Sequence, residues 1–150
     1  MNARVASLQL KRTHGKVPTP VDPVVGRVGG GFEGDLHVAK ATRGVVVIDR
    51  STHDALGLRP GDLREQVTVE GLQDLDSLAP GTQLRLGGIT LRVNGPCEPC
   101  THIGDMLDQA DPEEFRQMLV GRRGVTCTVV AAEGVARVGD PVTMLSPVAA

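Results

Sequence analysis

The sequence predicts a mostly β, barrel-like domain with a few short helices. Short apolar runs are separated by turns rich in glycine, proline and aspartate, and only two segments carry a helical pattern. The longest apolar runs, such as residues 45–48, have the length of strands rather than of transmembrane helices. Many short strands with few helices are typical of barrel-like domains. We expect one domain, residues 1–150, large enough for an apolar core.

Two hairpins and one buried strand follow from local patterns. Within residues 84–93, apolar side chains alternate with Arg and Thr on both sides of Gly87-Gly88, which predicts a hairpin with a two-residue turn. A second hairpin is expected over residues 125–138, with its turn at Glu133-Gly134. Val45–Ile48 is apolar throughout and predicts a strand buried on both faces. Shorter strands are expected near residues 8–10 and 67–69.

Two helices and one loop complete the expected elements. Residues 111–120 place Asp111 at the N-cap, followed by proline at the first helical position and two glutamates in the first turn. The inward stripe of this helix is expected to be Phe115, Met118 and Leu119. A shorter helix is expected after Ser51, with Ser51 as its cap. Glycines 29–31 match no phosphate loop and are expected to form a mobile loop.

Composition and charge disfavour several classes of function. The formal net charge of -2 provides no basic field for nucleic acid and no polybasic membrane patch. The two Phe are the only aromatic residues, which disfavours a site that stacks nucleic-acid bases. The N-terminal stretch lacks the apolar core of a signal peptide, so a cytoplasmic location with reduced cysteines is expected. We therefore expect neither a nucleic-acid partner nor membrane association.

Two of the three cysteines form a Cys-x-x-Cys pair in GPCEPC, residues 95–100, which leaves four interpretations open. A structural zinc site needs four ligands; a second pair is missing, and Cys127 alternates with valines like a buried core residue. A redox pair belongs at the start of a helix in a βαβ unit, whereas a hairpin precedes this pair. The others are a single functional thiolate, held rigidly by two prolines, and an inert loop.

Five segments follow the order of motifs in one known family. The first two are FEGDLH at residues 32–37, close to GLxGDxH, and PGDLREQVTVEGL at 60–72, close to GDLRENITVEGL. The others are PGTQLRLG at 80–87, close to GTRLRIG, then the cysteine loop, and RGV at 123–125 with VGDPV at 138–142. In this order they resemble the molybdenum-cofactor sulfurase C-terminal (MOSC) domain family, with a core over about residues 25–146.

The resemblance implies a MOSC-type β-barrel, of the pyruvate kinase β-barrel-like class, that binds a molybdenum-pterin cofactor. By position Cys100 matches the family's molybdenum ligand or sulfur carrier, so Cys100 is the expected catalytic residue and metal ligand, with Cys97 as an auxiliary thiol. The implied activity is reduction of N-hydroxylated compounds with electrons from a separate reductase. The alternative is a persulfide carrier, loaded by a cysteine desulfurase, that delivers sulfur for metal-sulfur or cofactor assembly. No pyridoxal phosphate is expected, because the three lysines lie in no recognisable motif for it.

Five further residues match family positions that the resemblance assigns to cofactor binding. Arg64 matches the arginine of REN, and its guanidinium suits phosphate or pterin oxygens. Gln66 stands where the family usually has Asn, which keeps the amide but lengthens the side chain. Asp35 and His37 match GDxH, and Arg123 belongs to RGV. Without the resemblance each would be interpreted as a turn or surface residue.

Overall fold

The computed structural model describes residues 3–72, 75–98 and 101–145, without the side chains of Thr101 and His102. Most of these residues lie in strands and loops. The strands are β1 (Arg4–Leu10), β2 (Thr19–Pro20), β3 (Val24–Val25), β4 (Val45–Asp49), β5 (Val67–Glu70), β6 (Gln83–Leu86), β7 (Ile89–Pro96), β8 (Val125–Ala132), β9 (Val135–Ala136) and β10 (Val142–Leu145). The helices are α1 (Arg50–Leu56), α2 (Thr101–Met106) and α3 (Pro112–Met118), with a 3-10 turn η1 (Leu75–Ser77).

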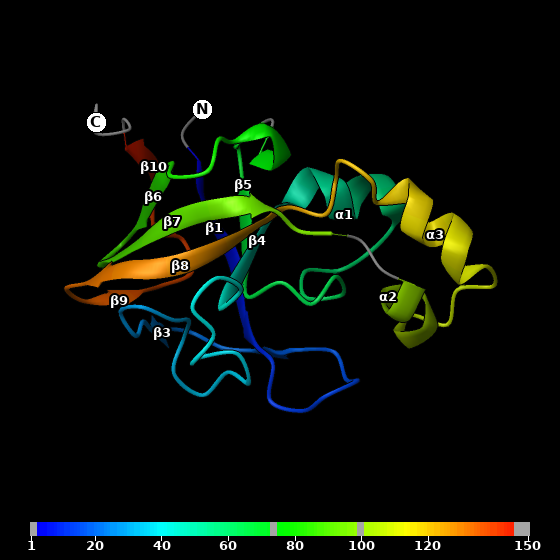
Figure 1. Cartoon of the computed structure of the whole chain (residues 1–150), viewed down its shortest axis with the longest axis horizontal. Coiled ribbons are helices and arrows are strands. Elements are labelled where there is room, and N and C mark those ends of the chain that lie inside the picture. The colour runs from blue at the N-terminus through cyan, green and yellow to red at the C-terminus, as the bar shows by residue number, and fades with distance from the viewer. Residues whose placement is uncertain (1–2, 73–74, 99–100, 146–150) are drawn as a thin grey trace.

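Eight strands form one sheet in the order β10-β6-β7-β8-β4-β5-β1-β2, and the three helices gather at one end of it (Figure 1). Neighbouring strands are antiparallel except for the parallel pair β4–β5. The mostly β prediction is confirmed, but the described ladder does not close into a barrel. Among the described residues, one bridge from Arg4 of β1 to Pro141, just before β10, links the two sides of the sheet, supported by the bond from Val5 N to Asp140 O at 2.8 Å. Within the described residues β1 begins beside this bridge, and all four residues of β10 pair with β6.

One predicted hairpin is confirmed and the other is wrong. β6 and β7 pair around Gly87-Gly88 with Leu86 opposite Ile89, as predicted. β9 instead pairs with β3, so residues 125–138 do not form the expected hairpin. The physical reason is the turn at Glu133-Gly134, which packs on the β6–β7 turn: Glu133 N donates to Gly88 O at 2.9 Å. This contact directs the chain away from β8.

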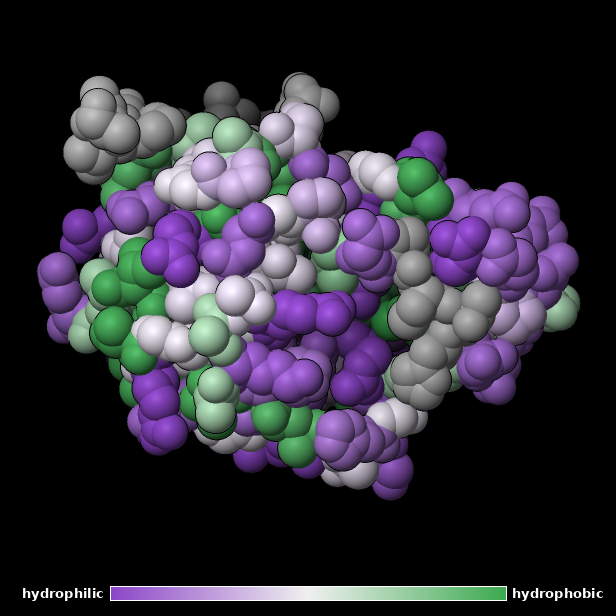
Figure 2. All heavy atoms as spheres, viewed as in Figure 1, coloured by the Kyte–Doolittle hydropathy of each residue, from purple (hydrophilic) through white to green (hydrophobic). Residues whose placement is uncertain are grey.

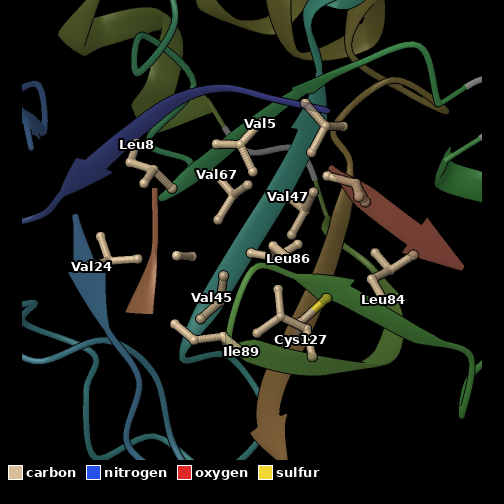
Figure 3. Packing of buried hydrophobic residues seen from close by; sticks show 14 of the residues in the cluster. Val5, Leu8, Val24, Val45, Val47, Val67, Leu84, Leu86, Ile89 and Cys127 are labelled. Atoms are coloured by element: carbon tan, nitrogen blue, oxygen red, sulfur yellow. The ribbon is translucent and has the colours of Figure 1, made fainter. Parts of the chain in front are cut away.

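The core has two parts, and β4 separates them. Val45 and Val47 belong to the larger cluster between the strands, shown in Figure 3. Val46 and Ile48 belong to a smaller cluster that α2 and α3 complete through Ile103, Phe115 and Leu119. Because successive side chains of a strand point to opposite faces, an all-apolar strand is required at this position. The prediction of a strand buried on both faces is confirmed.

The predicted helices form, with three differences. Asp111 caps α3 by accepting from Glu114 N at 3.0 Å, as predicted. Met118, predicted to face inward, is instead 47% exposed, because the smaller cluster contacts this helix through Phe115 and Leu119. The cap of α1 is Asp49, which accepts from Ser51 N at 2.9 Å, and not Ser51 itself. The short helix α2 has no periodic pattern long enough to be predicted. No helix in the described part of the chain is long and apolar enough to cross a membrane.

Glycines 29–31 form a packed segment, so the expectation of a mobile loop is wrong. Val129 N donates to Gly30 O at 2.9 Å, and Gly31 N donates to Val38 O at 2.9 Å. A Cβ atom on Gly30 would lie 2.0 Å from Val38 O, so only glycine allows this approach. The contact holds the loop that runs from residue 37 to β4 against β8.

Candidate functional site

A pocket of about 210 Å³ opens where β1, the loop before β4, the turn before β5, the end of β7 and α2 come together. Figure 2 shows hydrophilic residues gathered near the centre of this face, between the sheet and the helices. The basic side chains that line the pocket are Lys11, Lys40, Arg43, Arg64 and Arg123. Among its described lining residues, Glu98 is the one carboxylate. The pocket therefore has the electrostatic character of an anion-binding site.

The basic lining is crowded enough to change how its own members titrate. Burial and then the charge of Arg64 lower the pKa of Lys11 to about 8, although Asp35 acts in the opposite direction. Burial and the charges of Lys11 and Lys40 lower the pKa of His37 to about 4. At neutral pH Lys11 is therefore protonated and the His37 imidazole is neutral. Burial is the largest cause of both shifts, and the neighbouring cations add to it.

Asp35 and Gln66 hold the pocket's backbone in place. Asp35 is buried, and its carboxylate accepts from Lys11 N at 2.7 Å and from His37 N at 2.8 Å. Gln66 is also buried; its Nε2 donates to Asp35 at 3.2 Å and its Oε1 accepts from Val46 N at 2.7 Å. Their polar atoms are thus engaged by the chain itself, and direct contact of either residue with a ligand stays a prediction.

Arg64 enters the pocket from a tight turn. Its backbone is left-handed, with a φ of 60°, and its N–H donates to Gly61 O at 2.8 Å. A non-glycine residue in this region costs about 1–2 kcal/mol relative to ordinary geometry. The side chain is buried, and Nη1 donates to Lys16 O at 2.6 Å. The turn therefore directs the guanidinium into the pocket at a conformational cost.

Arg123 provides two buried donors without partners. The residue is 5% exposed, and its Nε and Nη1 atoms have no hydrogen-bond partner among the described residues. The next residue, Gly124, has a φ of 81°, and a Cβ atom there would lie 2.1 Å from Val47 O. Gly124 N donates to Asp76 at 2.9 Å and Gly124 O accepts from Cys97 N at 2.9 Å. Within the described residues no acceptor meets these two nitrogens, and buried donors in this state favour an acceptor such as a bound anion.

The two described cysteines lie in different environments. Cys97 lines the basic pocket, whereas Cys127 is fully buried in the larger cluster, where burial raises its pKa. The core role predicted for Cys127 is confirmed. Cys100, the expected ligand, lies outside the described residues. Within the described ranges, no group of three or more His, Cys, Asp or Glu side chains is placed to hold a metal ion.

A larger hollow of about 360 Å³ lies along α1 and η1. Its charged lining residues are Asp49, Asp76 and Arg122. Both carboxylates already accept backbone hydrogen bonds. The smaller basic pocket, with its unpaired donors and its thiol, is the better candidate for a functional site.

The sequence matches the family model described as MOSC domain over residues 26–143. The chain belongs to the MOSC domain family. The resemblance seen in the ordered motifs is thereby confirmed, and this family is associated with the molybdenum cofactor. A comparison with functionally curated proteins gives no match.

Solved structures show the same MOSC fold. The YuaD protein from Bacillus subtilis is similar with a TM-score of 0.83 and 24% identity, over 95% of this chain and 94% of that one. YiiM from Geobacillus stearothermophilus has a TM-score of 0.71 and 21% identity, over 96% and 75% of the two chains. YiiM from Escherichia coli has a TM-score of 0.69 and 19% identity, over 98% and 72%. At these identities the likeness concerns the fold.

The MOSC fold brings together four residues singled out in the sequence: His37, Arg64, Cys97 and Arg123. Asp35 and Gln66 lie beside them as supports. Sequence reasoning missed three basic lining residues, Lys11, Lys40 and Arg43. Lys40 and Arg43 follow the GDxH motif closely, which was an available signal. Lys11 had none, because only the pairing of β1 with β5 brings it near Arg64.

Proposed function

We propose that this MOSC domain binds a molybdenum-pterin cofactor in the basic pocket. The observation that carries the proposal is Arg123, whose buried guanidinium presents two unpartnered nitrogens within the described residues. A phosphate or pterin oxygen would supply the missing acceptors, and such charge-assisted bonds are strong. Arg64 and Lys11 would contribute to the same anion site, with Lys40 and Arg43 adding positive charge.

The chemistry of the donor set fits this cofactor. Cationic N–H groups suit its phosphate, and a thiol-bearing loop suits molybdenum, because thiolate is a soft ligand. The volume of about 210 Å³ is below the range of roughly 300–1,000 Å³ for small-molecule pockets. The described pocket would therefore hold part of the cofactor, and its basic lining favours the anionic part.

The proposed activity is reduction of N-hydroxylated compounds, with Cys100 as molybdenum ligand on the basis of its sequence position. When bound, the cofactor would supply two-electron redox chemistry, with electrons from a separate reductase. Reducing an N–OH group to N–H consumes two electrons and two protons and releases water. Lys11 is suited to hold one such proton at Nζ, since burial lowers its pKa to about 8, close to neutral pH.

The test is molybdenum content. The protein is purified from a host that makes the cofactor, and molybdenum per chain is measured by mass spectrometry. Wild type should carry the metal, and Cys100→Ser and Arg123→Met should lose most of it. Arg122→Met is the matched control, because this neighbouring arginine is exposed and lines the other hollow. Absence of molybdenum from wild type, or equal amounts in Cys100→Ser, would contradict the proposal.

A second candidate is the persulfide carrier, which one observation favours. The Cys97 thiol lines the same pocket as Lys11 and Arg123, so the described part of the pocket already presents a thiol among cationic side chains. A cysteine desulfurase would transfer the terminal sulfur of its own persulfide to Cys100 and regain its thiolate, with Cys97 as the resolving thiol. Intact mass after incubation with a desulfurase and free cysteine should show one added sulfur that is absent in Cys100→Ser. An unchanged wild-type mass would remove this candidate.

A further inference from the structure

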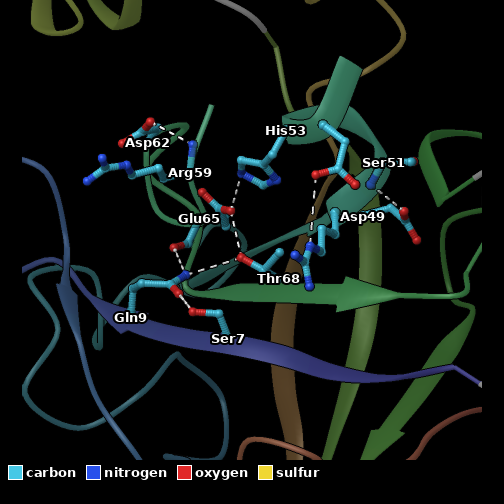
Figure 4. A network of polar contacts seen from close by, with 11 residues as sticks. Ser7, Gln9, Asp49, Ser51, His53, Arg59, Asp62, Glu65 and Thr68 are labelled. Carbon is cyan, nitrogen blue, oxygen red and sulfur yellow. Dashed lines mark hydrogen bonds and ion pairs between the residues drawn. The ribbon is translucent and has the colours of Figure 1, made fainter. Parts of the chain in front are cut away.

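A buried ion pair lies next to the pocket residue Arg64 in the sequence. His53 on α1 and Glu65 before β5 have side chains 1% and 0% exposed, and His53 Nε2 lies 2.6 Å from Glu65 Oε2. This contact is at ion-pair distance but lacks the alignment of a standard hydrogen bond. Thr68 Oγ1 donates to the same carboxylate oxygen at 2.7 Å. Figure 4 shows the pair bridging α1 and the chain that enters β5.

The network around the pair also holds the backbone of Glu65. Gln9 Nε2 donates to Glu65 O at 3.1 Å and lies 3.4 Å from Thr68 Oγ1, which ties β1 to the turn. His53 Nδ1 and Glu65 Oε1 have no partner among the described residues. A buried polar pair of this kind adds little net stability compared with an apolar pair of the same size. Its position therefore suggests a conformational role.

That role concerns the strained residue between two buried neighbours. Arg64 has a φ of 60°, and Leu63 before it and Glu65 after it are fully buried. Such strain, of order 1–3 kcal/mol, persists only where the surroundings leave the chain no alternative. Leu63 is fixed by the smaller apolar cluster, and Glu65 is fixed by His53 and Thr68. The chain on both sides of Arg64 is thus held.

We propose that the His53–Glu65 pair is a positioning device that keeps Arg64 in its left-handed conformation, with the guanidinium in the pocket. Breaking the pair leaves the buried Glu65 Oε2 without its His53 partner, and a buried polar group that loses a partner is costly. Movement of that carboxylate toward water relieves the cost and lets residue 64 leave the left-handed region. His53 and Glu65 act through Arg64 rather than on a ligand. The inference rests on the proposed anion-binding role of the pocket.

The test is a double-mutant cycle on the affinity for inorganic pyrophosphate, measured by calorimetry. His53→Leu and Arg64→Ala should each weaken binding about tenfold, the scale of one lost charge-assisted contact. The double variant should bind no worse than Arg64→Ala alone, because the pair acts only through that residue. His53→Gln, which keeps an N–H donor, should bind within about threefold of wild type. Leu86→Ala, a core truncation in the larger cluster, should lower the melting temperature without changing the affinity.

An additional tenfold loss in the double variant, or an equal loss in Leu86→Ala, overturns the inference. If His53→Leu does not fold, Glu65→Gln takes its place in the cycle. A wild type that binds no pyrophosphate counts against the proposed function instead. The inference is then decided by the Arg64 Nε–H resonance in nitrogen-15 NMR. The Nε proton of Arg64 should exchange slowly with water in wild type and rapidly once the pair is broken. An unchanged exchange rate refutes the positioning role.

Discussion

Replacing Lys11 with methionine should stabilise the protein at neutral pH and weaken its pocket. Burial first, and then the charge of Arg64, lower the pKa of Lys11 from 10.5 to about 8, a net change that includes the opposing effect of Asp35. Each pKa unit corresponds to about 1.4 kcal/mol, so a charged Lys11 destabilises the folded state by about 3 kcal/mol relative to the unfolded chain. Methionine keeps the apolar stem and removes this charge. The free energy of unfolding of Lys11→Met should therefore exceed that of wild type by up to about 3 kcal/mol near pH 7.

The pH dependence gives this prediction a sharper form. Between pH 8 and 10.5 the unfolded chain binds more protons at Lys11 than the folded chain does, so wild-type stability rises with pH through this window. The advantage of Lys11→Met should shrink as the pH rises from about 7 to about 10. Guanidinium unfolding at both pH values measures the difference in unfolding free energy between the variant and wild type. Lys40 is exposed, so the control variant Lys40→Met should show no comparable difference. Two results would refute the reasoning: a Lys11→Met protein less stable than wild type near neutral pH, or a difference in unfolding free energy that does not shrink as the pH rises.

Three further outcomes follow from the structure. Because burial lowers the pKa of His37 to about 4, wild type should lose stability as the pH falls from 6.5 to about 4, and urea unfolding of His37→Asn should show a weaker acid dependence. Gly124→Ala should lower stability by more than about 3 kcal/mol in thermal unfolding, because its Cβ atom would clash with Val47 O. The control Gly121→Ala should lower stability much less, because the space around its Cβ atom is open. Asp35→Asn should lower the free energy of unfolding by about 2 kcal/mol, because charge-assisted bonds to the backbone N–H groups of Lys11 and His37 are lost. The denaturant midpoint should fall, and an unchanged midpoint would contradict this role.

Local patterns predicted the elements whose cause is local. The all-apolar run of β4 requires burial on both faces, and the two core clusters supply it. The Gly87-Gly88 turn sets the register of β6 and β7, and the Asp111 carboxylate satisfies the start of α3. For the turn and the cap, the deciding interaction joins residues that are close in sequence. For β4 the apolar pattern is local, although the clusters that bury it come from remote segments.

Predictions failed where a distant contact decided the outcome. The segment after β8 had a good hairpin pattern, but packing of its turn on Gly88 sent β9 to β3. The glycine pattern around Gly30 predicted a mobile loop. Gly30 instead packs closely against Val38, which is possible because glycine has no side chain. Lys11 was overlooked as a site residue because nothing in its neighbours marks it.

The sequence by itself determined strand β4, the β6–β7 hairpin, the cap of α3 and membership in the MOSC domain family, because periodicity, capping and the order of motifs are all written along the chain. Only the tertiary structure decided that Lys11, Arg64 and Arg123 share one pocket, since strand pairing joins residues remote in sequence. It also decided the state of these groups. Burial and neighbouring charge lower the pKa of Lys11, and packing leaves Nε and Nη1 of Arg123 without a partner among the described residues.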